Sequence, residues 1–184
     1  MASNEEPDTE LDRYEDQIHF PISREKNRDR LQVLAGRERT DDSYFWIIED
    51  LQGEKVGYFA TFDCDARNGV FKYAVVILRL QWGKGYARDA VCVVLRYYFR
   101  ELRYQKVVAL VYSFNERSIR LHRGLGFQLE GRVRRMVYTN GKFYDELIFG
   151  LTCEEFDQVD PPSYLGDIPG ESHELIPEAA PITT

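Results

Sequence analysis

The sequence lacks a long apolar run, a metal-binding cysteine pattern and the length of a second domain. No stretch of its 184 residues approaches the roughly 20 apolar residues of a membrane-spanning helix. The acidic N-terminus also lacks the apolar core of a signal peptide. Cys64, Cys92 and Cys153 are too widely spaced for a metal site, so we expect reduced core cysteines and no metal. We therefore predict one cytoplasmic domain without a membrane partner.

Basic residues are absent from the C-terminal segment and scarce at the N-terminus. Residues 1–16 contain seven acidic residues and one arginine, and residues 154–184 contain eight acidic residues without lysine or arginine. The intervening residues 17–153 carry a net charge of +7, against −7 for the whole chain. This basic core suits an anionic cofactor, whereas the acidic ends oppose nucleic-acid binding.

These composition changes divide the chain into three parts. We predict a disordered acidic N-terminus over residues 1–16, a folded domain over residues 17–157 and an acidic, proline-containing tail over residues 158–184.

Periodicity and turn residues predict an α+β fold. We expect helices over residues 23–36 (capped by Ser23), 87–103 and 116–124, strands over residues 44–49, 55–62, 71–79, 107–112, 127–139 and 142–151, and a polar loop over residues 63–69. The last two strands form a hairpin about Asn140-Gly141. The sheet is then mixed and mostly antiparallel, with a parallel βαβ unit built on residues 71–79, 87–103 and 107–112.

The stretch Phe71 to Arg88 combines an apolar strand, a glycine turn and the start of a helix. Glycines allow a phosphate to approach the backbone, and the first amides of the helix point at it. A turn used only for packing would have the same pattern. The stretch matches neither the Walker loop nor Gly-x-Gly-x-x-Gly, the motifs typical of ATP and NAD sites. ATP or NAD is therefore a weaker hypothesis than another phosphate-containing cofactor.

A second motif lies at Asn115 to Phe127, with the sequence NERSIRLHRGLGF. Together with the WGKGYA turn beginning at Trp82, it resembles the GNAT superfamily of acetyl-CoA-dependent N-acetyltransferases, and most of all the RimJ/RimL and spermidine N-acetyltransferase branch. The resemblance covers about residues 18–151. It implies the GNAT fold, with a V-shaped cofactor cleft between strands four and five of the family. It also implies acetyl-CoA as co-substrate, an amine acceptor and a chain that can form a homodimer.

The resemblance assigns roles to individual residues. Strand backbone at Val75, Val76 and Ile77 would bind the pantetheine, and His122 stands where many relatives have the tyrosine that protonates the leaving thiolate. Asn115 would hold the pantetheine or the acetyl end, which makes it the second catalytic candidate. The remaining cofactor contacts would come from Trp82, Gly83, Lys84, Gly85, Tyr86, Ala87, Arg88, Ser118 and Arg123.

Each assignment has a structural alternative. His122 can be a packing or surface residue, and Asn115 can simply cap the helix in which Ser118 is a first-turn residue. Three residues of the last hairpin can line the acceptor site or form cross-strand packing with a polar rim, and two acids near the first hairpin can supply a base or shape a turn. These are Tyr138, Tyr144 and Asp145, and Glu49 and Asp50, respectively.

Three departures from the family pattern bear on the substrate. The family's first strand is missing or altered before Ile18, and Trp82 replaces the usual Gln or Arg of the glycine motif. Lys72 stands where polyamine-acetylating relatives carry a carboxylate, which disfavours a spermidine-like acceptor. The leading hypothesis is transfer of acetyl from acetyl-CoA to a primary amine of a small molecule or protein N-terminus, by direct attack in a ternary complex. The alternative is a non-catalytic acyl-CoA sensor or interaction module.

Overall fold

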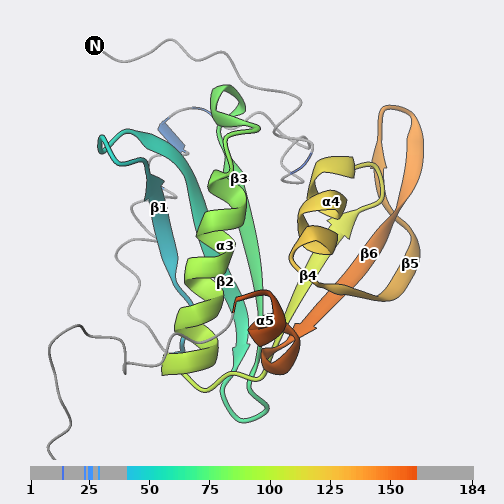
Figure 1. Cartoon of the computed structure of the whole chain (residues 1–184). Helices are drawn as coiled ribbons and strands as arrows, with labels where there is room; N and C mark the ends of the chain where they lie inside the picture. Colours follow the sequence, from blue (N-terminus) through green and yellow to red (C-terminus); the bar gives the residue numbers. More distant parts are fainter. Residues whose placement is uncertain (1–13, 15–22, 24, 27–28, 30–40, 161–184) are drawn as a thin grey trace, which may run out of the picture.

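The computed structural model describes residues 14, 23, 25–26, 29 and 41–160, and all that follows concerns these residues (Figure 1). They form one six-stranded sheet in the order β1-β2-β3-β4-β6-β5. The strands are β1 (Phe45–Glu49), β2 (Lys55–Asp65), β3 (Val70–Ile77), β4 (Lys106–Tyr112), β5 (Gln128–Thr139) and β6 (Lys142–Thr152).

All neighbouring strands are antiparallel except β3 and β4, which are parallel. This pair is joined by α3 (Tyr86–Arg96), which continues through a π-helical turn, η2 (Tyr97–Glu101). The predicted α+β class, the βαβ unit and the hairpin about Asn140-Gly141 are therefore confirmed.

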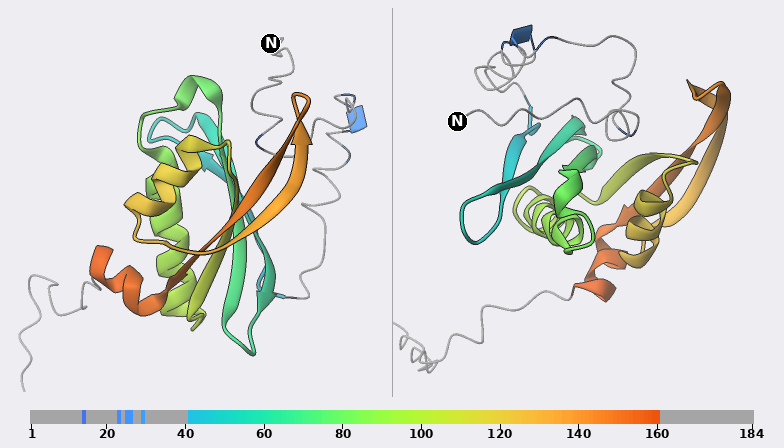
Figure 2. Two further views of the ribbon diagram at one scale, coloured as in Figure 1. Left: turned by 90° about the vertical axis from the view of Figure 1, so that its right-hand side faces the viewer. Right: turned by 90° about the horizontal axis from the view of Figure 1, so that it is seen from above.

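Two further helices complete the described structure. They are α4 (Glu116–Gly124) and α5 (Cys153–Val159). α3 and α4 lie over the same face of the sheet, and the outer end of the β5–β6 hairpin leads away from these helices (Figure 2). The sequence did not lead us to expect α5, which begins with a capping box between Thr152 and Glu155.

The core fills the space between the helices and that face of the sheet. Aromatic rings dominate it: Phe71 of β3 stacks on Tyr98 of η2 at 4.0 Å between ring centroids, and Phe59 of β2 stacks on Tyr73 at 5.1 Å. Phe149 of β6 is also fully buried, in the part of the sheet that lies beyond β4. Burial of rings on both sides fixes the relative positions of α3 and α4.

Several boundaries differ from those expected. The predicted loop 63–69 is wrong over its first part, because β2 continues to Asp65 through an irregularity that follows Phe62. β3 ends at Ile77, and the next residues form a 3-10 turn, η1 (Arg79–Gln81). The predicted helix 87–103 loses regular α geometry after Arg96, where η2 begins.

The N-terminal helix is described only in part. The amide of Lys26 donates to Ser23 Oγ at 3.2 Å, which is the bond expected of an N-cap. The rest of the predicted helix 23–36, the region where the family's first strand was predicted to be missing or altered, residues 161–184 of the predicted tail 158–184 and all of residues 1–16 except Tyr14 lie outside the described residues. Within the described part, no helix is long and apolar enough to cross a membrane.

Candidate active site

The two parallel strands of the sheet separate along their length. β3 pairs with β4 only from Val70–Lys72 to the facing residues 106–108, although both strands continue beyond this point. β3 stays paired with β2, and β4 with β6, through their remaining lengths. The edge of β3 that faces β4 is therefore without a strand partner from Tyr73 to Ile77 (Figure 1).

The hydrogen-bond pattern shows which backbone groups line this free edge. The amide of Leu78 donates to the Val56 carbonyl at 2.9 Å on the β2 side, and direction alternates along an antiparallel ladder. The backbone groups of Val76 therefore also point to β2, whereas those of Val75 and Ile77 point to the free edge. The structure thus brings two of the three predicted strand residues to the edge, and it turns the backbone of Val76 away from it.

The glycine turn follows this edge directly and starts α3. Gly83 has φ 78° and Gly85 has φ 91°, in the left-handed region that residues with a Cβ rarely adopt. A Cβ at either position would meet no atom within 4 Å, so the space beside both glycines is open. Among the described residues no side chain caps the helix at Gly85, and these residues leave the amides of Tyr86, Ala87 and Arg88 for another acceptor. This open, uncapped helix start fits the pyrophosphate of a coenzyme.

Side chains around the turn join it to β3 and α4. The indole of Trp82 donates to the Ile77 carbonyl at 2.7 Å, so one group of the free edge is already occupied. The guanidinium of Arg117 on α4 lies 4.1 Å from the centre of the Trp82 ring. Arg88 Nη1 donates to the Gly124 carbonyl at the end of α4 at 2.8 Å. The two sequence motifs are therefore in direct contact at both ends of α4.

Three of the predicted basic residues lie on this turn and on the two helices beside it. Lys84 is exposed and its ammonium donates to Gln81 Oε1 at 2.6 Å. Arg123 is exposed next to Gly124, the residue that Arg88 contacts. These three cations on α3, α4 and the turn produce a positive potential that favours phosphate.

The start of α4 is closed by its own side chains. Asn115 Oδ1 accepts from the Ser118 amide at 3.0 Å, the bond of a helix N-cap. The alternative reading of Asn115 as a cap is therefore real, and only its side-chain amide group is left for a cofactor. Ser118 is half-buried, and its hydroxyl lies 3.3 Å from His122 Nδ1.

His122 lies in the core rather than on an open surface, with 3% of its surface exposed. Its Nδ1 donates to the Ser118 carbonyl at 2.7 Å, which leaves Nε2 to accept from the Tyr73 hydroxyl at 2.8 Å. Its ring stacks on Phe149 at 5.6 Å between centroids. Burial lowers the pKa of His122 below its ordinary value, an effect that the bond to Ser118 opposes. Burial therefore disfavours the charged form of His122, and both ring nitrogens have partners.

Two of the residues predicted for the acceptor side, Tyr138 and Asp50, have structural partners as well. Tyr138 faces Phe143 across the β5–β6 hairpin, with ring centroids 4.9 Å apart, as cross-strand packing requires. Asp50 Oδ1 accepts the amides of Gln52 and Glu54 and so builds the β1–β2 turn. Glu49, which precedes it, is exposed at the end of β1.

Lys72 carries a charge that is already paired. Its ammonium lies 3.0 Å from Asp63 Oδ2, where β2 becomes irregular. The predicted repulsion of a polyamine by Lys72 is thus reduced by an adjacent carboxylate.

Sequence reasoning missed an aromatic cluster at the open end of the split. Tyr14 stacks on Phe114 at 5.8 Å and approaches Trp82 edge-on at 6.3 Å, so it touches residues that follow β3 and β4. Phe114 also contacts Tyr112 at 5.6 Å and Tyr144 at 4.9 Å. The only available signal was the pair of aromatics just before Asn115, because Tyr14 lies far away in sequence.

Comparison with known proteins supports the same interpretation. The family model for an acetyltransferase (GNAT) domain matches residues 3–128. A SPbeta prophage-derived N-acetyltransferase of Bacillus subtilis (strain 168) is 41% identical over 150 residues, which cover 82% of each chain. The spermidine N(1)-acetyltransferase of Escherichia coli (strain K12) is 27% identical over 113 residues, or 61% of each chain.

Solved structures agree with the fold. The spermidine N-acetyltransferase of Vibrio cholerae, in complex with CoA and spermine, superimposes with a TM-score of 0.70 over 80% of this chain and 85% of that chain, at 18% identity. A structure described as a putative acetyltransferase gives a TM-score of 0.69 at 25% identity, over 83% of this chain and 77% of that one. The family model and the alignment with the relative from Bacillus subtilis each cover most of this sequence. This chain therefore belongs to the GNAT acetyltransferase family and is an acyltransferase.

Proposed function

We propose that this protein is an N-acetyltransferase that transfers acetyl from acetyl-CoA to a primary amine of a small molecule or a protein N-terminus, by direct attack in a ternary complex. The observation that carries the proposal is the free edge of β3 that leads directly into the uncapped glycine turn. An extended pantetheine suits the first feature and a pyrophosphate suits the second. The order of the two features matches the order of these groups in coenzyme A.

The coenzyme would supply an activated acetyl thioester, and the chain would supply its position. Backbone groups of Val75 and Ile77 would bind the pantetheine as a further strand, and the amides from Trp82 to Arg88 would hold the pyrophosphate. An amide on the free edge can also stabilise the oxyanion formed during acyl transfer. The positioning of both reactants then provides much of the rate acceleration, on the order of several kcal/mol.

The two catalytic candidates have unequal support. The amide group of Asn115 can still contact the acetyl end while its oxygen caps α4. The role of His122 as proton donor stays a prediction, and its burial between Tyr73 and Ser118 favours a positioning role. Water or the acceptor amine itself can then protonate the thiolate.

The finer classification belongs to this proposal too. Membership of the RimJ/RimL branch rests on the second motif, and a cytoplasmic setting rests on composition. The Vibrio cholerae enzyme was solved with spermine, and the ion pair between Lys72 and Asp63 weakens the sequence-based argument against a similar polycation here.

A non-catalytic acyl-CoA sensor is the second candidate, and the burial of His122 favours it. Two measurements separate the candidates. Calorimetry should show coenzyme A binding in both cases, and the absence of binding at moderate salt would remove both. Release of free thiol from acetyl-CoA in the presence of a panel of amines should occur only for the enzyme. Binding without amine-dependent release would identify a sensor.

ATP and NAD serve as controls for the ligand class. Neither nucleotide should displace coenzyme A at comparable concentration. Displacement by either would favour a nucleotide site on the βαβ unit.

A further inference from the structure

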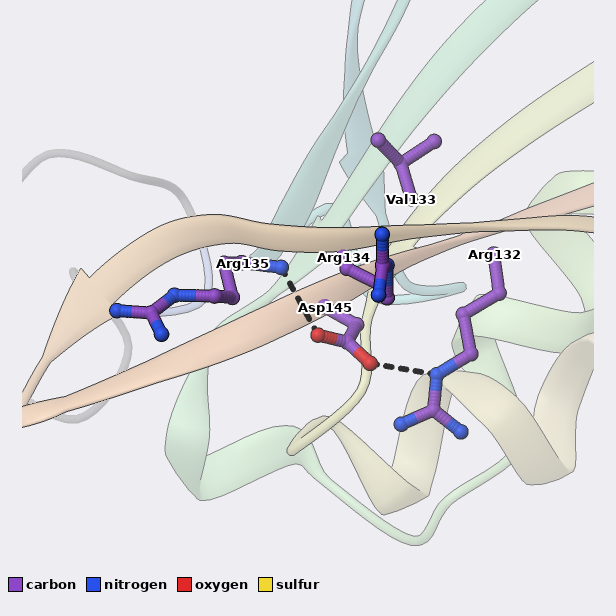
Figure 3. Close-up of a pocket in the computed structure, with 5 residues that line it drawn as sticks. All are labelled: Arg132, Val133, Arg134, Arg135 and Asp145. Atoms are coloured by element: carbon purple, nitrogen blue, oxygen red, sulfur yellow. Dashed lines mark hydrogen bonds and ion pairs between the residues drawn. The ribbon is translucent and has the colours of Figure 1, made fainter.

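The outer hairpin carries a bulge that is rich in arginine. The register of β5 against β6 shifts between Val133 and Val137, so that residues 134–136 face the single residue Asp145. Arg135, within the bulge, has φ 60°. Arg132 precedes the bulge, and Arg134 and Arg135 lie within it. These three arginines, here together named the arginine bulge, line a surface depression with Val133 and Asp145 (Figure 3).

The carboxylate of Asp145 forms hydrogen bonds within this bulge and so stabilises its conformation. Its carboxylate accepts the Arg135 amide at 2.9 Å and Arg132 Nε at 2.5 Å, as the dashed lines of Figure 3 show. These bonds, with the Arg135 amide first, hold the pKa of Asp145 below its ordinary value. One carboxylate and three guanidiniums leave the depression with two uncompensated positive charges.

The remaining arginine groups are available to a ligand. The side chain of Arg134 forms no hydrogen bond and no ion pair with the described residues, and its charge helps to hold the pKa of Asp145 below the ordinary value. The guanidinium of Arg135 lies 4.3 Å from the centre of the Phe143 ring, which holds it without neutralising it. Guanidinium groups match carboxylate and phosphate oxygens in pairs, so an anionic group is the ligand that this surface fits.

The arginine bulge is directly connected to the candidate active site. The Ser113 amide donates to the Asp145 carbonyl at 2.8 Å, and the Asp145 amide donates to Ser113 Oγ at 3.1 Å. Ser113 follows the end of β4 and comes two residues before Asn115, where the second motif begins. Tyr144, next to Asp145, also contacts Phe114 of the aromatic cluster. The bulge on β5 therefore lies beyond β4 and β6 from the split, and Asp145 and Tyr144 of β6 connect it to the residues that follow β4.

We propose that the acceptor amine carries an anionic group, a carboxylate or a phosphate, and that the arginine bulge binds this group while the amine reaches the open end of the split. This inference rests on the proposed acetyltransferase function. It names an acceptor class that is opposite in charge to spermine, because a polycation would be repelled by the uncompensated arginines.

The first test uses pairs of primary amines that differ by one carboxylate. One pair is an amino acid and its carboxamide, and the other is a short peptide with Glu or Gln after a free N-terminus. With acetyl-CoA and a thiol readout, we expect kcat/KM for the acidic member to exceed that for the amide by about 10-fold or more. Equal values within each pair, or faster acetylation of spermidine, would overturn the proposal.

The second test uses Arg134→Gln with Arg135→Gln, and Arg67→Gln as the matched control. All three side chains are exposed, and Arg67 lies in the turn between β2 and β3. The double variant should lose the preference for the acidic amine and keep KM for acetyl-CoA within about twofold, whereas the control should behave like the native protein. If instead KM for acetyl-CoA rises and the acceptor preference survives, the bulge binds a coenzyme phosphate and the acceptor assignment is wrong.

A binding measurement separates this inference from the proposed function. The acidic and amide peptides are titrated by calorimetry into the protein saturated with coenzyme A, which needs no turnover. Preferential binding of the acidic peptide that the double variant loses supports the bulge even if no amine is acetylated. Equal binding of both peptides refutes it even if the enzyme is active.

Discussion

The starts of α3 and α4 lie side by side and are built in opposite ways. α3 begins at Gly85 with a left-handed backbone, and no side chain in the described part of the chain caps it. α4 begins at Asn115, whose oxygen accepts the Ser118 amide, and the same helix carries the buried His122. Arg117 of α4 rests on Trp82 of the glycine turn, so the open and the closed helix start share one contact.

The glycine turn and the Asn115 motif should therefore have different roles. The open start of α3 offers backbone amides and a helix dipole to an anion, and no side chain of residues 41–160 competes for them. The closed start of α4 satisfies its polar groups internally and thereby fixes the position of the helix. On the proposed function, binding of the coenzyme's pyrophosphate should therefore depend on the start of α3, and stability should depend on α4.

The largest effect is expected from Gly85→Glu. A side chain and a negative charge would enter the open space beside the turn, and the backbone φ of 91° would be strained. We expect the Kd for coenzyme A, measured by calorimetry, to rise by at least about 100-fold, because charge repulsion and loss of the amide cradle act together.

Gly53→Glu is the matched control for this change. Gly53 lies in the β1–β2 turn with φ 82°, and a Cβ there also meets no atom within 4 Å. The Gly53→Glu substitution introduces the same backbone strain and the same negative charge at a position away from α3, so the affinity for coenzyme A should be retained. Equal loss of affinity in both variants would show that general destabilisation is responsible, and the contrast between the two helix starts would fail.

The next effect concerns the closed helix and is one of stability. His122→Phe leaves the Tyr73 hydroxyl and the Ser118 carbonyl without their present partner in the core. The free energy of unfolding should fall by about 1–3 kcal/mol in urea titrations. Turnover of the folded variant should stay within about threefold if His122 only positions α4. A 100-fold loss of turnover with unchanged coenzyme A affinity would instead establish His122 as the proton donor.

Tyr73→Phe completes a double-mutant cycle for this pair. When both polar partners are replaced together, the Tyr73 hydroxyl is no longer left unsatisfied, so the double variant should be less destabilised than the sum of the single changes. Strict additivity would mean that the bond between Tyr73 and His122 does not contribute to folding.

Local patterns predicted much of the fold but not the state of this histidine. Asn140-Gly141 specified its hairpin because both residues tolerate a positive φ, and the structure has them at 51° and 72°. The glycine turn was equally visible, since its conformation depends on Gly83 and Gly85 themselves. His122 is buried by Tyr73 and Phe149, which come from strands far away in sequence, and no local pattern reports such contacts.

Other misses had local signals that were outweighed. The capping box of Thr152 and Glu155 marks the start of α5, but it follows a long strand and precedes an acidic tail. The end of β2 contains Asp63 and Asp65, which favour a loop by composition. The sheet nevertheless continues there, with Asp63 at φ 49° and Asp65 facing Val70. The arginine bulge was missed because residues 134–136 read as regular strand.

A smaller effect separates the two roles of Asn115. Asn115→Ala removes the cap of α4 and should lower the free energy of unfolding by about 1 kcal/mol, whereas Asn115→Asp keeps a capping oxygen and should cost less. Both changes remove the side-chain amide group, so both should weaken acetyl-CoA binding if that group contacts the cofactor. Unchanged affinity in both variants would make Asn115 purely a cap and would sharpen the contrast with α3.

The smallest effect is the pH dependence of stability that His122 introduces. Because burial holds its folded pKa below the unfolded value of about 6.5, neutral His122 stabilises the fold above that pH, and this stability is lost as pH falls toward the folded pKa. The slope from this one group cannot exceed about 1.4 kcal/mol per pH unit. Burial raises the pKa of its partner Tyr73, which stays neutral throughout. In urea titrations at pH values from 7.5 down to 5, the free energy of unfolding should therefore fall more steeply for the native protein than for His122→Phe. Parallel curves would place His122 in contact with water, and α4 would then be open like α3.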